Sequence, residues 1–257
     1  MAIVLAIANQ KGGVGKTAST LNLGAALAEV GKRTLLVDLD PQANLTAGVG
    51  VELAEEAATT YHSLFEAASA AEAVRELAWP RLSLLPSSID LSGAELQLVS
   101  EMNRETVLRR VLAPVRGQYD FILIDCPPSL GLLTLNGLSA ADGVIVPLQC
   151  GYWALRGIRL LLGTIDRVRE SGLNGDLQLL GILLTMYDAR TAVSTEVEER
   201  ARAGFGKKVF TPVIRKTVRM EYASIAAQPI VYFDPSSAVA AAYRSVAKEV
   251  LKRAKES

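Results

Sequence analysis

Five short apolar segments recur along the chain, and longer stretches of mixed polarity separate them. The segments span residues 3–8, 34–40, 121–128, 143–149 and 179–185. Within each segment the apolar residues are continuous instead of alternating with polar ones, which is typical of strands buried on both faces of a parallel sheet. The stretches between them are long enough for crossover helices. The pattern therefore predicts an α/β fold: a doubly wound, mostly parallel sheet flanked by helices on both faces.

Two further segments have a helical pattern. Residues 52–80 are rich in Ala and Glu and end at Pro80, which predicts a small helical excursion. From about Pro235 onward, apolar residues at helical spacing form one stripe that should pack against the sheet, namely Val239, Tyr243, Val246 and Val250. Linker-like tracts and internal repeats are absent from the sequence, so we expect a single domain over residues 1–257.

Composition and charge narrow the class of protein. The chain has 257 residues, 50% of them hydrophobic, and its 27 basic and 27 acidic residues cancel. The balance is uneven, since residues 190–257 carry 13 basic and 7 acidic side chains, which permits a basic surface on a neutral protein. The two cysteines, Cys126 and Cys150, lack metal-type spacing and predict a reducing, cytoplasmic compartment. The amino-terminal apolar run lacks the flanks of a signal peptide and is predicted to be a strand.

A glycine-rich loop, NQKGGVGKTAST at residues 9–20, follows the first apolar segment. Its GKT matches the end of the phosphate-binding pattern G-x-x-x-x-G-K-[ST], although Gln10 stands where the first glycine belongs. A strand, a glycine loop and a helix starting near Lys16 place backbone N–H groups and the positive helix end around phosphates. We expect Lys16 to reach the β- and γ-phosphates and Thr17 to bind Mg²⁺. This pattern does not explain a second lysine, Lys11.

Acidic side chains end two of the apolar segments. Asp125 follows four apolar residues in FILIDCPPS, where its carboxylate can hold Mg²⁺ through water. Asp38 and Asp40 in LLVDLDPQAN fall at the carboxyl end of the second segment, the edge where open α/β sheets bind ligands. Their spacing of two predicts that they share one face of a strand. We assign Asp38 to the metal, together with Asp125 and Thr17. Asp40 is assigned the catalytic role of orienting the attacking water.

The chain resembles the ParA/Soj chromosome- and plasmid-partitioning ATPases, which carry a deviant Walker A loop, in four motifs: KGGVGKT, LLVDLDPQAN, FILIDCPPSLGLLTLNGL and LLTMYDART. The resemblance covers nearly the whole chain. It implies ATP and Mg²⁺ as cofactors, and ATP hydrolysis that is slow until a partner stimulates it. The nucleotide-binding residues that follow from it are Lys11, Gly12, Gly13, Val14, Gly15, Lys16, Thr17, Ala18 and Met186.

The resemblance also explains the second lysine of the loop. In ParA/Soj proteins two ATP-bound subunits dock face to face, and the lysine that matches Lys11 reaches the phosphates of the other subunit. Lys11 is therefore predicted to be catalytic together with Lys16 and Asp40. Gly12 is expected at the interface, where a side chain would push the subunits apart. A positive charge added near phosphates is worth most where water is excluded, so we expect an ATP-dependent homodimer.

The basic carboxyl-terminal third predicts a polyanion as partner. Basic residues recur at steps of three or four along the last helix and form a ridge, namely Arg244, Lys248, Lys252 and Lys255. The resemblance implicates Arg190 and Arg219 in DNA binding. We predict nonspecific binding of double-stranded DNA, because phosphate contacts carry no sequence information; the predicted residues are Arg190, Lys216, Arg219, Lys248 and Lys252. The resemblance further implies a ParB-like, centromere-bound partner and a nucleoid-associated location.

Two other classes of protein share the loop and remain alternatives. A MinD-like membrane-cycling ATPase ends in an amphipathic helix whose bulky apolar residues insert into lipid. The tail after Phe233 has small apolar residues and no Phe or Trp, so we expect no membrane partner. An iron–sulfur reductase of the nitrogenase-iron-protein type would bridge a cluster with cysteines such as Cys126 and Cys150. Free cysteines are most often small buried residues, so this alternative is less favoured.

Overall fold

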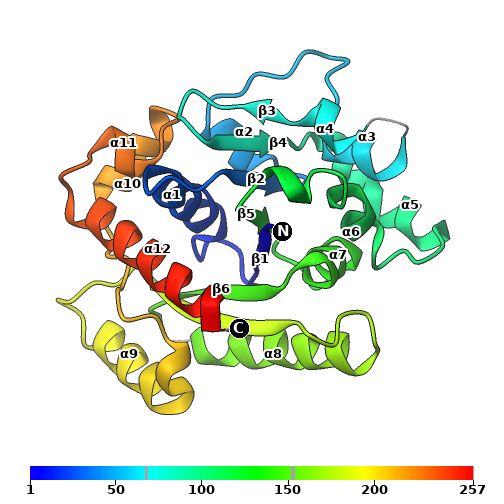
Figure 1. Ribbon diagram of the computed structural model, residues 1–257. Coiled ribbons are helices and arrows are strands. Elements are labelled where there is room, and N and C mark those ends of the chain that lie inside the picture. The colour runs from blue at the N-terminus through cyan, green and yellow to red at the C-terminus, as the bar shows by residue number, and fades with distance from the viewer. Residues whose placement is uncertain (67–68, 152–153, 257) are drawn as a thin grey trace.

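The computed structural model describes residues 1–66, 69–151 and 154–256. Over these residues the chain forms one sheet in the order β3-β4-β2-β5-β1-β6-β7 (Figure 1). Its strands are parallel except for β3, which runs antiparallel to β4. The strand bounds are β1 Ile3–Ile7, β2 Thr34–Asp38, β3 Arg75–Glu76, β4 Leu82–Leu85, β5 Phe121–Asp125, β6 Gly143–Gln149 and β7 Gln178–Thr185.

The doubly wound α/β fold predicted from the apolar segments is confirmed, and each of the five segments contains a strand. Three strands are shorter than their segments, because β1 ends at Ile7, β2 ends at Asp38 and β5 ends at Asp125. Pro127 and Pro128 follow β5 and lack the N–H group that a longer ladder would need. After β2 the backbone N–H of Asp40 bonds to the carboxylate of Asp38 instead of to a neighbouring strand.

The excursion predicted as helical over residues 52–80 is helical only in part. It contains two short helices, α3 Thr60–Phe65 and α4 Ala70–Ala73, and it ends in the strand β3. Arg81, with a φ of +64°, lies in the turn that leads from β3 into β4. The sequence pattern does not predict β4, because Ser83 interrupts its short apolar run. The strand is nevertheless fully buried between β3 and β2.

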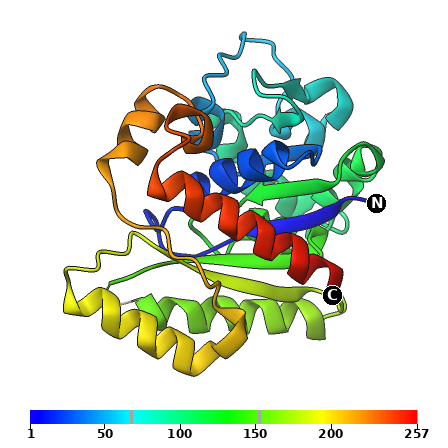
Figure 2. The ribbon, with the colours of Figure 1, turned by 60° about the vertical axis from the view of Figure 1, so that its left-hand side comes forward.

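Successive side chains point to opposite faces of the sheet, so each central strand contributes to two hydrophobic layers. In β1, Val4 and Ala6 pack into one layer, whereas Leu5 and Ile7 pack into the other. The first layer contains α3 and α4 together with α5 Ala94–Ser100, α6 Val107–Leu112, α7 Leu132–Ala140, α8 Ala154–Glu170 and α9 Ala192–Phe205. The second contains α1 Lys16–Glu29, α2 Asn44–Gly48, α10 Val218–Ile225, α11 Ile230–Phe233 and α12 Ala238–Glu256. Figure 2 shows α12 crossing its face of the sheet beside α1, with α8 and α9 on the opposite side.

The last helix begins at Ala238, close to the predicted start, and its predicted apolar stripe is buried. It packs against α1 and β7. Arg244, predicted as part of an exposed ridge, instead donates to the carboxylate of Glu29 on α1 at 2.8 and 2.9 Å. Its guanidinium also donates to the backbone carbonyl of Val231. Arg244 therefore ties α12 to α1 and is removed from the ridge. Within the described part of the chain, none of the helices combines the length and apolar character that crossing a membrane requires.

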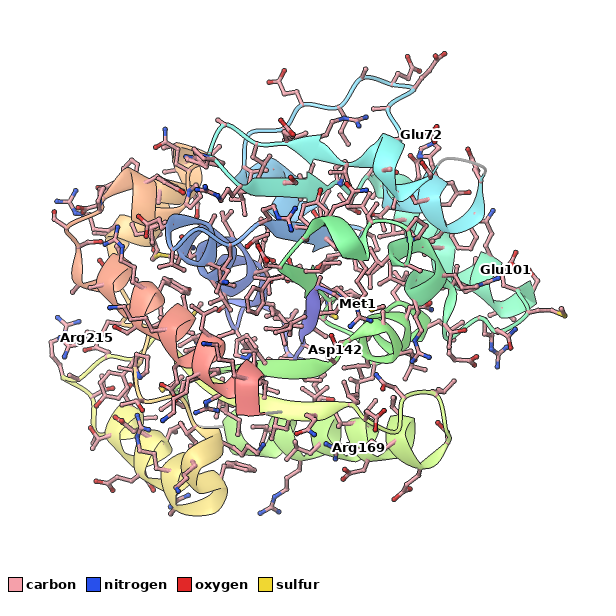
Figure 3. The ribbon with its side chains drawn as sticks, viewed as in Figure 1. Met1, Glu72, Glu101, Asp142, Arg169 and Arg215 are labelled. Carbon is pink, nitrogen blue, oxygen red and sulfur yellow. The ribbon has the colours of Figure 1, made fainter. Side chains whose placement is uncertain are left out.

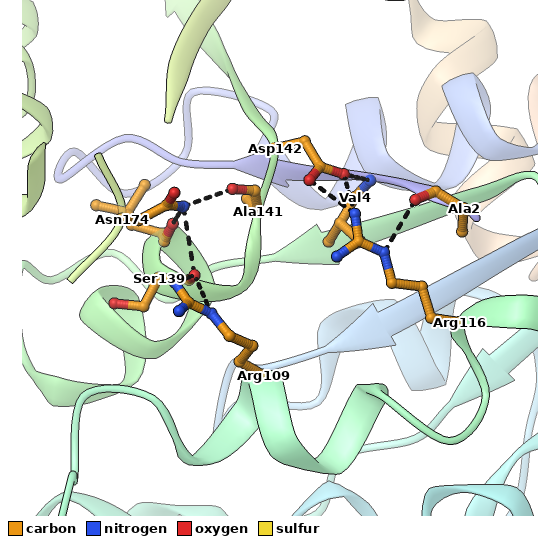
Figure 4. Close-up of polar contacts among 9 residues, drawn as sticks. Ala2, Val4, Arg109, Arg116, Ser139, Ala141, Asp142 and Asn174 are labelled. Atoms are coloured by element: carbon orange, nitrogen blue, oxygen red, sulfur yellow. Dashed lines mark hydrogen bonds and ion pairs between the residues drawn. The ribbon is translucent and has the colours of Figure 1, made fainter. Parts of the chain in front are cut away.

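Polar side chains at the amino ends of β1 and β6 bind one another (Figure 4). Arg116 pairs with both carboxylate oxygens of Asp142 at 2.6 and 2.7 Å, and Asp142 also accepts from the backbone N–H of Val4. Arg109 donates to the backbone carbonyl of Ser139 through two of its nitrogens. A cavity of about 580 Å³ lies among these groups. The charged groups at this end of the sheet therefore satisfy one another's hydrogen bonds.

Candidate nucleotide and metal site

The loop between β1 and α1 has the backbone shape of an anion cradle. Gly13 and Gly15 take φ angles of +70° and +85°, which residues with a Cβ rarely adopt. Gly15 is the N-cap residue of α1, and Lys16 is the first residue of the helix. The first N–H groups of a helix have no partner within it, and they lie at the positive end of the helix dipole. The loop therefore presents hydrogen-bond donors suited to a phosphate group.

The loop is anchored to the two strands beside it. The side chain of Asn9 accepts from the backbone N–H of Lys11 at 3.0 Å and donates to the backbone carbonyl of Pro147 on β6 at 2.7 Å. The hydroxyl of Thr185, the last residue of β7, donates to the carbonyl of Val14 at 2.8 Å. Both contacts fix the loop before any ligand is bound, which lowers the entropy cost of binding.

The two lysines of the loop occupy different environments. The ammonium group of Lys16 is buried and donates to the backbone carbonyl of Lys11 at 3.3 Å. Burial lowers the pKa of Lys16, and the carboxylates of Asp125 and Asp40 oppose this shift. Lys11 is exposed, and its ammonium group donates to the side-chain oxygen of Gln149 at 3.2 Å. One lysine therefore lies inside the site and the other lies at its rim.

Asp125, at the end of β5, has a buried carboxylate oxygen without a hydrogen-bond partner. Its Oδ1 accepts from the hydroxyl of Thr20 at 3.3 Å, whereas no group in the described residues bonds to Oδ2. Burial, followed by the neighbouring carboxylate of Asp38, raises the pKa of Asp125 to about 8, and the hydroxyl of Thr17 and the ammonium of Lys16 oppose this shift. A buried, unpaired carboxylate oxygen is costly unless a cation or donor reaches it. The donor set therefore fits a hard cation such as Mg²⁺.

Asp38 and Asp40 lie at the same edge of the sheet, but they do not share a strand face as predicted. Asp38 is the last residue of β2, opposite Asp125 in the register, and the chain turns immediately after it. Its carboxylate accepts from the N–H of Asp40 at 3.2 Å and from the N–H and hydroxyl of Thr46 at 2.8 and 2.7 Å. Burial raises the pKa of Asp38 to about 6, and the Thr46 hydrogen bonds oppose this shift. In Asp40, Oδ1 accepts from the N–H of Gln42 at 3.0 Å.

The predicted nucleotide and metal residues thus fall around one loop. The charges of Asp125 and Asp40 act on Lys16, and the hydroxyl of Thr17 interacts with Asp125. Val14 is buried under the loop, and Ala18 is half-buried in the first turn of α1. Gly12 is exposed, and a Cβ built there meets only Pro128, at 4.0 Å. Met186 follows Thr185 at the end of β7 and has a φ of +51°. The roles of these residues toward a nucleotide stay predictions.

Three polar residues of the site were missing from the sequence-based prediction. Thr20 donates to Asp125, Thr46 donates to Asp38, and Ser87 donates to the backbone carbonyl of Asp40 at 2.9 Å. Thr20 lies one helical turn after Lys16, so helical spacing could have pointed to it. Ser87 follows the unpredicted strand β4, and the sequence around Thr46 carries no comparable signal.

The five predicted DNA-binding residues lie on two separate surfaces. Arg190 and Lys216 lie beyond the carboxyl end of β7, where the N–H of Lys216 donates to the carbonyl of Tyr187. Arg190 pairs with Asp188 at 2.8 Å but its side chain is 89% exposed. Arg219 is the second residue of α10; it pairs with Asp234 at 3.5 Å, and its side chain is 59% exposed. Arg215, four residues earlier, lies on the outer surface (Figure 3). We name Arg190, Arg215, Lys216 and Arg219 the upper basic surface.

Lys248 and Lys252 instead line a groove of about 1030 Å³ between α12 and the 3₁₀ turn Gly206–Lys208. The groove includes Gln178 at the amino end of β7, about 23 Å from the carboxyl end of that strand at 3.3 Å per residue, and it also includes Thr211, four residues before Arg215. Its lining holds one acidic side chain, Glu249, and six basic ones: Arg202, Lys207, Lys208, Lys248, Lys252 and Arg253. We name it the lower basic groove.

The cysteines offer no cluster site. Cys126 is fully buried and packs beside Gly137, where a Cβ would lie 2.8 Å from its Sγ. Burial raises the pKa of its thiol far above the ordinary range. Cys150 is also buried, and both thiols are free. Among the residues that the structure describes, no three His, Cys, Asp or Glu side chains are grouped as metal ligands.

Comparison with known proteins identifies the family. A family model described as "AAA domain" matches residues 2–179. The chromosome-partitioning ATPase Soj of Treponema pallidum is 48% identical over 253 residues, which are 98% of each protein. The sporulation initiation inhibitor protein Soj of Bacillus subtilis is 46% identical over 250 residues, covering 97% of this chain and 98% of that protein.

A solved structure is similar over the same length. The cobyrinic acid a,c-diamide synthase of Mycobacterium smegmatis, crystallised with bound ADP and magnesium, superposes with a TM-score of 0.87. It is 42% identical, and the match covers 99% of this chain and 96% of that one. The matches to the two Soj proteins cover 97% and 98% of this chain. The chain belongs to the Soj/ParA family of chromosome-partitioning ATPases.

Proposed function

We propose that the protein hydrolyses ATP to ADP and phosphate at the loop between β1 and α1, and that this reaction drives chromosome or plasmid segregation. The observation that carries the proposal is the buried ammonium of Lys16, which lies under a glycine loop and next to two aspartates. A buried cation near carboxylates is matched to the β- and γ-phosphates of a nucleotide held by Mg²⁺. The similar M. smegmatis structure, which holds ADP and magnesium, supports an adenine nucleotide and Mg²⁺ as ligands.

Magnesium fits the residues on the acidic side of the loop. Asp125 has the free buried oxygen, and the hydroxyl of Thr17 is close to it. Asp38 lies opposite Asp125 and is the third predicted metal residue, with its carboxylate already accepting three hydrogen bonds. When bound, the ion neutralises phosphate charge and orients the terminal phosphate group. The buried ammonium group of Lys16 supplies a second positive charge next to the terminal phosphate group.

Asp40 orients the attacking water in this proposal. Its Oδ1 accepts from the N–H of Gln42, whereas Oδ2 has no hydrogen-bond partner among the described residues. Oδ2 is therefore the oxygen that accepts a hydrogen bond from water. Asp40 is 7% exposed, so the water it holds is shielded from bulk solvent. A positioned carboxylate of this kind contributes by fixing the direction of attack and accepting a proton.

ATP also joins two copies of the chain in this proposal. Lys11 is exposed at the rim of the loop, and among the described residues its ammonium group bonds only the neutral side chain of Gln149. Reaching the phosphates of a second subunit gives this charge a stronger partner in a site that excludes water. Gly12 is exposed beside Lys11, and a Cβ there would meet only Pro128, at 4.0 Å, which leaves room for close approach of another backbone.

The ATP-bound dimer binds double-stranded DNA without sequence preference and moves with the nucleoid in the cytoplasm. The upper basic surface and the lower basic groove supply phosphate contacts, and dimerisation doubles both. A ParB-like, centromere-bound partner then stimulates hydrolysis and releases the dimer. The Soj relatives, one of which is described as a chromosome-partitioning ATPase, support this role.

The packing of α12 favours this proposal over membrane cycling. A membrane-inserting helix needs a free apolar face. In α12 the apolar stripe is already buried against α1 and β7, with Tyr243 only 1% exposed. Similarly, the burial of Cys126 disfavours an iron–sulfur cluster shared between subunits.

The proposal is tested by measuring phosphate release, sedimentation and DNA retention on the same preparation. Slow hydrolysis of ATP, a dimer formed only with ATP, and DNA binding that requires ATP are the expected results. Pelleting with anionic liposomes but not with DNA would instead support the membrane-cycling alternative. A protein that releases no phosphate with Mg²⁺–ATP, in the presence or absence of DNA, would overturn the assignment.

A further inference from the structure

We infer that Thr46 and Ser87 are positioning residues for hydrolysis, acting with Asp38 to fix the backbone of Asp40. The four residues, named here the Asp40 network, form a closed ring of hydrogen bonds at the carboxyl edge of the sheet. This inference rests on the proposed function, in which Asp40 orients the attacking water. It adds how the backbone of Asp40 is held in place. Thr46 and Ser87 touch neither nucleotide nor metal in this assignment.

The first half of the ring joins β2 to α2. Asp38, at the end of β2, accepts at Oδ2 from both the N–H and the hydroxyl of Thr46, at 2.8 and 2.7 Å. Its Oδ1 accepts from the N–H of Asp40 at 3.2 Å. One carboxylate therefore holds the two ends of the turn that carries Asp40. Hydrogen bonds to an ionised acceptor are stronger than those between neutral groups.

The second half of the ring joins the turn to the end of β4. The N–H of Ser87 donates to the hydroxyl oxygen of Thr46 at 2.9 Å, so this hydroxyl both donates and accepts. The hydroxyl of Ser87 in turn donates to the backbone carbonyl of Asp40 at 2.9 Å. The N–H and the C=O of Asp40 are thus held from opposite sides, by Asp38 and by Ser87.

Every member of the ring is shielded from water. Asp38 is 0% exposed, Ser87 1%, Thr46 3% and Asp40 7%. In such surroundings a hydroxyl or amide that loses its partner has no water to replace it, so the ring has one stable arrangement. The turn inside it is tight, since Ala43 has a φ of +51°. A rigid turn with one free oxygen, Oδ2 of Asp40, is what a water-orienting carboxylate requires.

The inference separates binding from chemistry. The phosphate-facing groups lie on the loop and on α1, whereas the ring lies on β2, α2 and the end of β4. Asp38 belongs both to the ring and to the predicted metal site, and in the ring variants its carboxylate still accepts from the backbone N–H groups of residues 40 and 46. Loosening the ring should therefore leave Lys16, Thr17 and the glycine loop in place. It should displace the carboxylate of Asp40, and a displacement of about 1 Å can cost roughly 10²-fold in rate.

The test compares Thr46→Val, Ser87→Ala and Thr46→Ser in the full chain. Thr46→Val keeps the shape of the side chain and removes the hydroxyl; Ser87→Ala removes a single donor; Thr46→Ser restores the hydroxyl. We measure kcat for ATP, the Kd of a fluorescent ATP analogue, and hydrogen exchange of the amides between Asp40 and Thr46. The matched control is Thr164→Val on α8, which removes a buried hydroxyl that donates to the carbonyl of Leu160, accepts from Arg167 and makes no hydrogen bond to the ring.

The expected result for Thr46→Val and Ser87→Ala is a fall in kcat of about 10- to 100-fold with an unchanged Kd. Exchange should rise between Asp40 and Thr46, and Thr46→Ser should recover the rate. The control should leave all three measurements at wild-type values. Wild-type kcat in both Thr46→Val and Ser87→Ala would overturn the inference. So would a Thr46→Ser protein as slow as Thr46→Val, or a loss of rate matched by an equal loss of binding.

Asp40→Ala, measured beside these variants, separates the two levels of the proposal. If Asp40→Ala is inactive while the ring variants hydrolyse normally, Asp40 keeps its role and the positioning inference fails. If Asp40→Ala hydrolyses ATP at the wild-type rate, the assignment of Asp40 itself fails, whatever the ring variants do.

Discussion

The ammonium group of Lys16 donates a hydrogen bond to the backbone carbonyl of Lys11 at 3.3 Å. The buried lysine therefore contacts the backbone of the exposed lysine. The side chain of Lys11 meanwhile extends to Gln149 on β6. The two positive charges of one loop are therefore directed to different places. This division predicts different outcomes when each lysine is replaced.

Replacing Lys16 with Ala should abolish ATP hydrolysis by weakening the hold on the β- and γ-phosphates. No second cation in the described residues lies within the buried part of the loop. Removing one preorganised charge of this kind costs about 10²- to 10³-fold in rate. The measurement is phosphate release together with binding of a fluorescent ATP analogue. Lys32→Ala, just before the amino end of β2, is the control and should behave as wild type; near-normal turnover of Lys16→Ala would contradict the site.

Replacing Asp40 with Ala should leave Mg²⁺–ATP bound while hydrolysis stops. Lys16, Thr17 and Asp125 remain in place, so the nucleotide keeps its main contacts. The protein should then accumulate as an ATP-bound dimer on DNA, because the step that releases it is missing. Light scattering with ATP reads out the dimer. A variant that stays monomeric with saturating ATP would show that Asp40 is needed for binding.

Folding stability without ligand should fall as the pH rises, because of Asp125. Its pKa in the folded protein is raised to about 8, above the ordinary value of 3.8. The folded state therefore holds a proton that the unfolded state has already lost between these pH values. The stabilisation is complete below pH 3.8 and is lost as the pH rises through about 8. Asp38, with a pKa raised to about 6, acts in the same direction over a narrower range.

The variant Asp125→Asn removes this ionisation and should flatten the pH dependence. In thermal unfolding with EDTA and no nucleotide, it should exceed the wild type in stability more at pH 8 than at pH 5. Its Mg²⁺-dependent hydrolysis should be lost at every pH. Asp176→Asn, an exposed carboxylate, serves as the control and should follow the wild-type curve. An identical pH slope in Asp125→Asn and the wild type would show that Asp125 is ionised throughout.

The strands that frame the site were predictable because burial on both faces leaves a plain signal. Each of β1, β2, β5, β6 and β7 is an almost unbroken apolar run, and a run of that kind admits few other structures in a chain of this length. The sequence pattern did not predict β4, because Ser83 interrupts its four-residue apolar run. It did not predict β3 either, because a strand of two residues is too short to show an alternating pattern. Both segments form strands because they pair with a neighbouring strand: β4 pairs with β2 in parallel, and β3 pairs with β4 in antiparallel orientation.

The residues of the site likewise fall into those that the sequence predicts and those that it does not. Lys16, Thr17 and Asp125 could be predicted, since the chemistry of phosphate and Mg²⁺ demands those residues at the end of a strand or the start of a helix. Thr46 and Ser87 could not, because their role depends on where β4 and α2 lie in space. The relation between Asp38 and Asp40 was misjudged because the strand ends at Asp38.

DNA affinity should depend on both basic surfaces. Arg190→Ala with Arg219→Ala weakens the upper surface, and Lys248→Ala with Lys252→Ala weakens the lower groove. Each pair should lower the affinity of the ATP-bound protein and reduce the salt slope by roughly 0.9 per lost phosphate contact. Titrations at several salt concentrations measure this. Arg33→Ala, an exposed arginine at the amino end of β2, is the control. An unchanged slope in one pair would exclude that surface from the contact.

Replacing Lys11 with Ala should leave ATP binding intact and abolish the dimer. The buried lysine, Thr17 and the backbone of the loop still hold the nucleotide, and within its own subunit Lys11 gives up only a hydrogen bond to Gln149. The charge that reaches the second subunit is missing, so the phosphates there are less neutralised in a site without water. Sedimentation with saturating ATP measures the result, with Asp40→Ala as the trapped dimer. DNA binding should fall too, since a monomer has half the basic contacts.

Gly12→Val should also abolish the ATP-dependent dimer, but through a steric clash and not through the loss of a charge. Comparing it with Lys11→Ala separates these two causes. Within the subunit, a Cβ at Gly12 meets only Pro128 at 4.0 Å, and Gly12, unlike Gly13 and Gly15, is not among the glycines with positive φ. The variant should therefore fold and bind ATP as the wild type does, which thermal unfolding and analogue binding will show. Its added side chain blocks close approach of the second subunit, so it should sediment as a monomer with ATP while retaining Lys11. A Lys11→Ala protein that dimerises as well as Asp40→Ala, beside a monomeric Gly12→Val, would place the interface at the loop but confine the charge of Lys11 to its own subunit.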